Sequence, residues 1–162
     1  MIQNLRVELW AQFGAAIDML ENSILIAEDE VWNSSADISH QAFHTLFFLD
    51  YYLSLNPVGF KPPEIFGYSE FEDFPPPSIF DRNEILGYLQ QCRQKASDLI
   101  LNLDEVQAEK RWINESKTMN FSIFEILLYN LRHVQHHAAQ LNLLLRQKIN
   151  QAPSWVFRAG EK

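Results

Sequence analysis

The sequence predicts an all-α protein, a four-helix bundle with a long crossover loop between the second and third helices. In four separate segments, apolar residues recur at steps of three or four, which is the period of a helix with one buried face. No segment shows a convincing alternation of polar and apolar residues, the pattern expected of a half-buried strand. Six of the seven prolines lie between residues 56 and 80, and that density excludes both helix and central strand there.

The first two helices are expected over residues 2–27 and 37–54. The apolar stripe of the first consists of Ile2, Leu5, Leu9, Phe13, Ala16, Leu20, Ile24 and Ala27. The second starts at Asp37 or Ser39, because either side chain can accept a hydrogen bond from the free backbone amides of a first turn. It stops before Pro57, because proline lacks a backbone donor and clashes inside a helix.

The third and fourth helices are expected over residues 81–103 and 122–149. Each begins with the arrangement of a capping box, an N-cap side chain followed three residues later by glutamate. The two pairs are Asp81 with Glu84 and Ser122 with Glu125. The fourth helix ends before Pro153.

Two connections are long. The loop of residues 56–80 can cross one end of the bundle or act as a lid, and we expect its many aromatic side chains to be covered by the bundle or by a partner chain. The polar stretch 104–120 is expected to be irregular, with Trp112 and Ile113 as the anchors of any short strand pair or turn. We therefore expect one four-helix domain over residues 1–150 and a C-terminal tail over 151–162.

The composition excludes several classes of protein. Hydrophobic residues make up 47% of the chain and charged residues 21%, which is the composition of a globular protein and not of a disordered one. The net charge of −8 would repel a phosphate backbone, so no nucleic-acid partner is expected. No apolar stretch approaches the ~20 residues that span a bilayer, and the first residues do not resemble a signal peptide. We expect a soluble, cytoplasmic protein without a membrane partner.

The five histidines occur only in the second and fourth predicted helices. His133 and His137 are four residues apart, so they point in directions only about 40° apart, toward the inside of the bundle. His136 is rotated by about 60° from His133 and is a weaker candidate for the same site. On the second helix, His44 shares its face with several aromatic residues, and His40 lies one turn earlier.

A metal site explains this distribution better than a packed core does. A single inward histidine is more often a hydrogen-bonded core residue than a ligand. Three buried imidazoles without a shared partner would each lose their hydration, however, which favours a common ion. His44, His133 and His137 would supply three ligands and leave a fourth position open, the pattern of catalytic zinc. Imidazole also binds nickel, copper and iron, so the donor type leaves the metal open.

Two segments resemble a known family. HVQHHAAQL, residues 133–141, is similar to the final-helix signature H-x-x-x-H-x-G-Q-L of the DinB and YfiT-like metalloenzymes, and His44 before LFFLDYYL resembles their second-helix histidine. The resemblance implies a four-helix bundle with a crossover, a divalent metal such as zinc or nickel bound by His44, His133 and His137, and a homodimer. Ala139 replaces the usual glycine, and the proline-rich loop is longer than expected.

Among the other polar residues, Gln140 has two possible interpretations. The rest are expected to have no catalytic role. Gln140 lies one turn beyond His137 and forms a hydrogen bond either to a metal-bound water or ligand nitrogen, or simply between helices. Asp50 points about 120° away from His44, so we expect it on the flank of the helix and not at the metal. Cys92 is expected in the core. The carboxylates of residues 70–73 are expected to be solvated or to form a lid surface.

The first functional hypothesis is a metal-dependent hydrolase or low-molecular-weight thiol transferase acting on a small molecule. A divalent ion would lower the pKa of a water or of a thiol cosubstrate. The alternative is a non-catalytic metal-binding or dimerisation module of a stress response. A general acid or base beside the metal would distinguish them, and the sequence identifies none, so whether the chain is an enzyme stays open.

Overall fold

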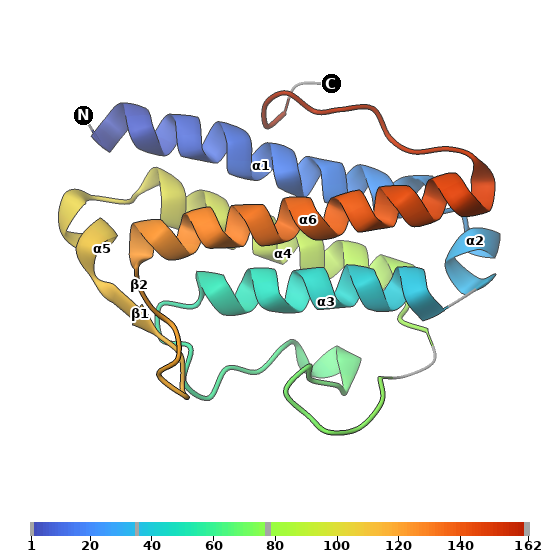
Figure 1. Ribbon diagram of the computed structural model, residues 1–162, viewed down its shortest axis with the longest axis horizontal. Coiled ribbons are helices and arrows are strands. Elements are labelled where there is room, and N and C mark those ends of the chain that lie inside the picture. Colours follow the sequence, from blue (N-terminus) through green and yellow to red (C-terminus); the bar gives the residue numbers. More distant parts are fainter. Residues whose placement is uncertain (1, 35, 77–78, 161–162) are drawn as a thin grey trace.

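The computed structural model describes residues 2–34, 36–76 and 79–160. Four long helices form the predicted bundle (Figure 1), and their bounds are α1 Ile2–Ile26, α3 Ala36–Leu53, α4 Arg82–Leu101 and α6 Ile123–Ile149. α1 and α3 each pack against both α4 and α6. The side chain of Ile2 and the whole of Pro77 lie outside the described part of the chain.

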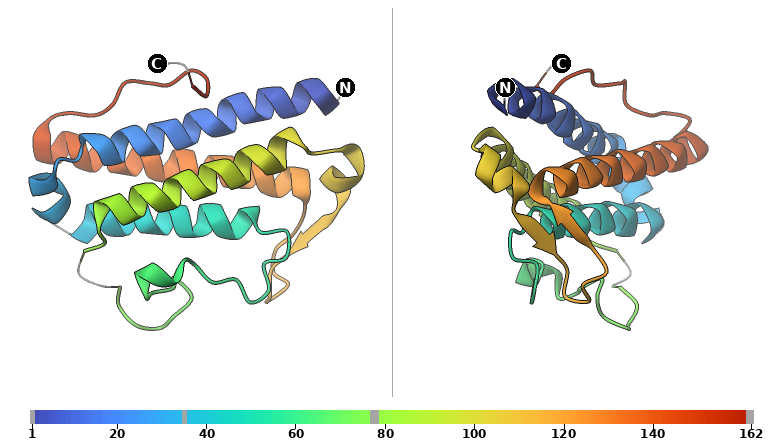
Figure 2. Two further views of the ribbon diagram at one scale, coloured as in Figure 1. Left: turned by 180° about the vertical axis from the view of Figure 1, so that it is seen from behind. Right: turned by 60° about the vertical axis from the view of Figure 1, so that its left-hand side comes forward.

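The predicted crossover is confirmed by the directions of the helices. α3 and α4 follow each other in the chain, yet they run in the same direction (Figure 2, left). The connection between them therefore has to return along the whole length of the bundle, outside α3. This return places residues of the long loop beside the middle of α3.

The predicted starts of α4 and α6 are confirmed by their caps. The Asp81 carboxylate accepts hydrogen bonds from the backbone amides of Asn83 and Glu84, at 2.9 and 3.0 Å. The Ser122 hydroxyl accepts one from the amide of Glu125 at 3.1 Å. Both caps satisfy backbone donors that the first helical turn leaves free.

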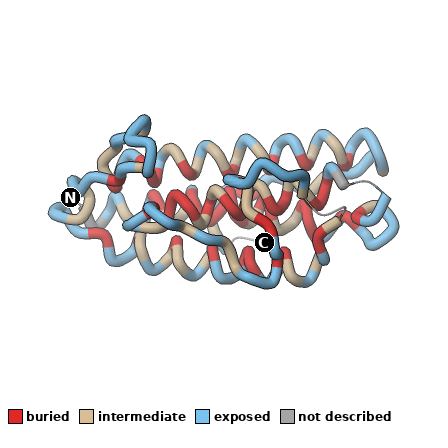
Figure 3. The backbone as a smooth tube through the Cα atoms, turned by 90° about the horizontal axis from the view of Figure 1, so that it is seen from below, coloured by how far each residue is buried: buried red, intermediate tan, exposed pale blue. Residues whose placement is uncertain are grey.

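The core lies between the inner faces of the four long helices, where buried residues line the interior in Figure 3. The apolar stripe predicted for α1 is buried from Leu9 to Ala27. Leu5, however, is 45% exposed, so that part of the prediction is wrong. Leu5 lines a cavity of about 250 Å³ at the end of the bundle, where the neighbouring elements do not close over it.

Four short elements outside the long loop were not assigned from the sequence patterns, although Trp112 and Ile113 were named as anchors of a possible strand pair. α2 spans Asp29–Ser34, α5 spans Glu105–Glu109, and β1 (Arg111–Ile113) pairs antiparallel with β2 (Asn120–Ser122). The prediction that residues 104–120 are irregular is therefore wrong in part. Trp112 explains the order there: it is fully buried, and its indole N–H donates to the Ser54 carbonyl at 2.9 Å.

The loop between α3 and α4 contains a short 3₁₀ helix, Glu64–Phe66, and is only partly covered. Phe66 and Tyr68 are buried against Phe43 and its neighbours. Phe71 and Phe74 remain 53% and 50% exposed, so the bundle does not cover these two, and their cover by a partner chain stays a prediction. The ring of Phe71 lies on the outer surface of α3, which covers only one side of it.

The C-terminal segment, residues 151–160, runs back along α1 (Figure 1). Val156 is buried, and the amide of Ala159 donates to the Ala11 carbonyl at 2.9 Å. A Cβ at Gly14 would lie only 2.6 Å from the Cβ of Ala159. The close approach of this segment to α1 thus depends on glycine at that position.

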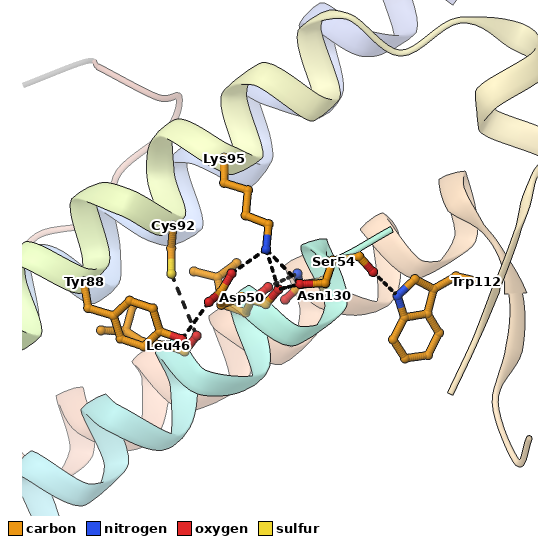
Figure 4. Close-up of polar contacts among 9 residues, drawn as sticks. Leu46, Asp50, Ser54, Tyr88, Cys92, Lys95, Trp112 and Asn130 are labelled. Carbon is orange, nitrogen blue, oxygen red and sulfur yellow. Dashed lines mark hydrogen bonds and ion pairs between the residues drawn. The ribbon is translucent and has the colours of Figure 1, made fainter. Parts of the chain in front are cut away.

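A polar network connects α3 to α4 away from the histidines (Figure 4). The Asp50 carboxylate accepts from the Tyr88 hydroxyl at 2.9 Å and pairs with the Lys95 ammonium at 2.6 Å. Lys95 also donates to the Ser54 hydroxyl at 2.8 Å. Asp50 therefore lies on the flank of α3, as expected. Cys92 is buried beside this network, and burial raises the pKa of its thiol well above the usual value.

Among the described residues, none of the helices combines the length and the apolar character needed to cross a lipid bilayer.

Candidate metal centre

The structure brings together the three histidines that the sequence singled out. His44 comes from α3, and His133 and His137 come from consecutive turns of α6. One ring nitrogen of each lies within 4.8 Å of one from each of the others. The ring centroids are 4.5 Å apart for His133 and His137, and 4.8 Å apart for His44 and His137. Three imidazoles at these separations can reach one ion with small side-chain adjustments.

The packing of α3 on α6 sets this geometry. Asn130, one turn before His133 on α6, is fully buried, and its side-chain amide donates to the Leu49 carbonyl of α3 at 3.0 Å. A side-chain bond to a helix carbonyl fixes the position of one helix along the other. The spacing of four residues on α6 then directs both of its histidines toward His44.

His133 is the least solvated of the three. Both of its ring nitrogens are buried, and neither has a hydrogen-bond partner within the described part of the chain. Burial, together with the neighbouring His137, His44 and His136, lowers the pKa of His133 to about 3. The ring is therefore neutral near pH 7 and has a lone pair to donate, which is the form that binds metals. Leaving a buried polar group unpaired costs about 1–3 kcal/mol, and a bound ion would remove that cost.

His44 contacts a carboxylate that the sequence analysis did not place at the site. Its Nδ1 lies 3.2 Å from Oε2 of Glu70, a residue of the long loop. When Nδ1 donates its proton to the carboxylate, the lone pair is on Nε2, as in metal-ligating histidines whose second nitrogen is hydrogen-bonded. Of the two expectations for the carboxylates of residues 70–73, full solvation does not hold for Glu70, whereas Glu72 and Asp73 are exposed.

His137 is flanked by two glutamine side chains. Its Nδ1 lies 2.6 Å from Oε1 of Gln140 and 2.6 Å from Nε2 of Gln41. Donation from Nδ1 to Gln140 is the arrangement that leaves the lone pair on Nε2. The first interpretation of Gln140, a hydrogen bond to a ligand nitrogen, agrees with this contact. Gln41 was missed, although its position one turn before His44 is a signal that could have identified it.

The remaining two histidines lie outside the trio. The ring of His40 packs edge-on against Phe80, with centroids 5.6 Å apart. His136 is exposed and contacts the ring of His137 at 5.0 Å. Together with Tyr129, Arg132 and His133, His136 lines a cavity of about 610 Å³ along α6. This cavity lies directly beside the buried imidazole of His133.

The donor set fits a divalent ion. Three imidazole nitrogens that can meet at one point suit zinc, nickel, copper or iron. Burial lowers the pKa of His137 as well, although its hydrogen bond to Gln140 acts in the opposite direction. Protons therefore compete only weakly with a metal for His133 and His137 near neutral pH.

Comparison with known proteins agrees with the fold and the histidines. The sequence matches the family model described as the DinB superfamily over residues 7–141, a span that contains His44, His133 and His137. No significant match is found among curated proteins or among solved structures. Because the match covers most of the chain and all three histidines of the cluster, the protein belongs to the DinB superfamily.

Proposed function

We propose that the protein is a metal-dependent enzyme in which His44, His133 and His137 hold one divalent ion, zinc or nickel. The observation that carries this proposal is His133, a buried neutral imidazole whose two nitrogens have no partner among the described residues while two further imidazoles lie beside it. An apolar core would not retain that arrangement without a shared ligand, because each unpaired polar group destabilises the fold.

The reaction that this site supports is hydrolysis or transfer of a low-molecular-weight thiol. Zinc with three protein ligands and an open position lowers the pKa of a water or a thiol. The chain itself can supply the orientation: in the tautomers that carry hydrogen on Nδ1, His44 and His137 donate hydrogen bonds to Glu70 and Gln140, which leaves the lone pairs of these rings on Nε2.

The cavity beside His133 is the proposed substrate site. All the residues that line it belong to α6, so this space of about 610 Å³ is an open depression on the surface of one helix, large enough for a small molecule. Its polar lining consists of hydrogen-bond donors and amides from Tyr129, Arg132, Gln135 and His136, and no carboxylate lines it. A small polar molecule bound there would lie next to the metal centre.

The test compares two reactions in the zinc-loaded and nickel-loaded protein. Hydrolysis of p-nitrophenyl acetate measures one activity, and conjugation of free cysteine to 1-chloro-2,4-dinitrobenzene measures the other. We expect at least one rate to exceed that of the free ion, to disappear in His133→Ala and to persist in His40→Ala. Full metal binding with neither rate above that of His133→Ala would contradict an enzyme of either class and favour the non-catalytic module.

The proposed assembly is a homodimer, as the resemblance to the family implies. It is supported by two apolar side chains on the outer side of α6, Leu128 and Leu143, which are 43% and 56% exposed. Light scattering tests this proposal, with an expected mass twice the 19.0 kDa of one chain. A mass of a single chain at micromolar concentration would contradict it.

A further inference from the structure

We propose that Glu70 is a positioning residue of the metal centre: from the long loop it fixes the tautomer and orientation of His44, and so couples metal binding to the placement of that loop. This inference rests on the proposed metal site. Glu70 lies in the loop between α3 and α4 and belongs to none of the four long helices. The helical pattern of the sequence therefore gives no reason to expect it at the metal.

The contact itself is specific. Oε2 of Glu70 lies 3.2 Å from Nδ1 of His44, and the side chains are only 21% and 34% exposed. Within the described part of the chain, Glu70 forms no ion pair with a lysine or an arginine. The polar group that its side chain contacts is the His44 ring. A carboxylate that accepts a hydrogen bond from Nδ1–H holds the ring in one tautomer, orients it and makes Nε2 a better electron-pair donor to a metal.

Phe71 anchors the loop where this contact occurs. Its ring packs against Phe47, Phe48 and Tyr51 of α3, with centroids 5.0, 5.9 and 5.1 Å apart. Phe48 in turn contacts the ring of His44 at 4.9 Å. The residue that follows Glu70 is thus fixed on the same face of α3 as His44.

A local turn directs the glutamate further. The backbone amide of Phe71 donates to the Ser69 hydroxyl at 3.3 Å, and the amide of Glu72 donates to the Ser69 carbonyl at 3.1 Å. This turn leaves Glu70 half-buried against His44 and Glu72 exposed. Two glutamates two residues apart therefore have different surroundings, and Glu72 is a matched control.

The contact between Glu70 and His44 couples metal binding to the placement of the loop. When two events depend on the same interaction, each favours the other by the same factor. A metal that holds His44 in the orientation required by Glu70 also holds Glu70, and with it the loop around Phe71. Zinc should therefore slow proteolytic cleavage of the loop in the wild type, and should do so less in Glu70→Ala.

The experiment is a chelator-competition titration of the full chain with zinc. Glu70→Ala should bind zinc about 10- to 100-fold more weakly than the wild type, the usual effect of removing a partner of a ligating histidine. Glu70→Gln keeps an acceptor oxygen and should recover at least part of the loss. Glu72→Gln should bind zinc within about twofold of the wild type, because its side chain is solvated.

A double-mutant cycle separates positioning of His44 from a general effect on the loop. In a His44→Ala background, Glu70→Ala should cause no further loss of zinc affinity, because its partner is already gone. Equal losses in both backgrounds, or a Glu70→Ala protein that binds zinc like Glu72→Gln, would overturn this inference alone. A wild type that binds no zinc would overturn the proposed function and this inference together.

Discussion

His44 of α3 and His137 of α6 lie edge to face, with ring centroids 4.8 Å apart and ring planes at 76°. His40, one turn before His44 on the same helix, has its ring against Phe80 instead. The two histidines of α3 therefore have different surroundings, and His44 is the one that groups with His133 and His137 of α6.

This difference predicts how two alanine variants rank. His44→Ala should lower zinc affinity by at least about 100-fold, because one of three proposed ligands is lost. His40→Ala should lower it by less than about threefold, since its ring does not belong to the trio. Competition with a chromophoric chelator measures both values. The reverse ranking would show that the wrong histidine of α3 was assigned to the ion.

The stability of the metal-free protein should fall in acid because of His133. Burial and the neighbouring histidines lower the pKa of His133 to about 3, against about 6.5 in an unfolded chain. Between these pH values the unfolded chain binds a proton that the folded chain does not, so stability is fully present above pH ~6.5 and declines as the pH falls toward 3. Urea unfolding at a series of pH values, in the presence of a chelator, measures this slope.

His133→Leu should remove a large part of the slope of unfolding free energy against pH, because leucine does not titrate. His136→Leu is the matched control on the same helix: His136 is exposed and is the smallest of the causes that lower the pKa of His133, so most of the slope should remain. If all three proteins show the same slope between pH 6.5 and 4, the buried imidazole of His133 is not its source.

Two glycine positions in helices should respond in opposite ways to alanine. Gly87 has no atom within 4 Å of an added Cβ, so Gly87→Ala should raise the stability by about 0.5–1 kcal/mol through helix propensity. Gly14→Ala would place its Cβ 2.6 Å from Ala159, so we expect it to displace the C-terminal segment and speed its proteolysis. Equal melting temperatures and equal proteolysis in the two variants would contradict the packing of residues 151–160 on α1.

Cys92 should be inert in the folded protein. Its side chain is 1% exposed, and burial raises the pKa of the thiol well above its usual value, so little thiolate is available. A colorimetric disulfide reagent should therefore react with one thiol per chain in denaturant and with almost none in native buffer. Rapid reaction of the native protein would contradict the buried position of Cys92.

The features that the sequence predicts best are those that depend on local spacing. The start of α6 at Ser122 follows from a cap and a glutamate three residues later, and the shared direction of His133 and His137 follows from the helical repeat. Glu70 could not be placed in this way, because its position depends on how Phe71 packs against α3 across the long loop. The β1–β2 pair could only be raised as a possibility for a similar reason: it depends on burial of Trp112 against Ser54 and not on a strand-like pattern.

We propose that His44, His133 and His137 hold one divalent ion, and elemental analysis of the purified protein tests this most directly. The wild type should contain about one divalent ion per chain, and His133→Ala and His137→Ala should each contain almost none while remaining folded. His136→Ala, which changes an exposed residue of the same helix, should keep the metal content of the wild type. Stoichiometric metal retained in both His133→Ala and His137→Ala would contradict the claim.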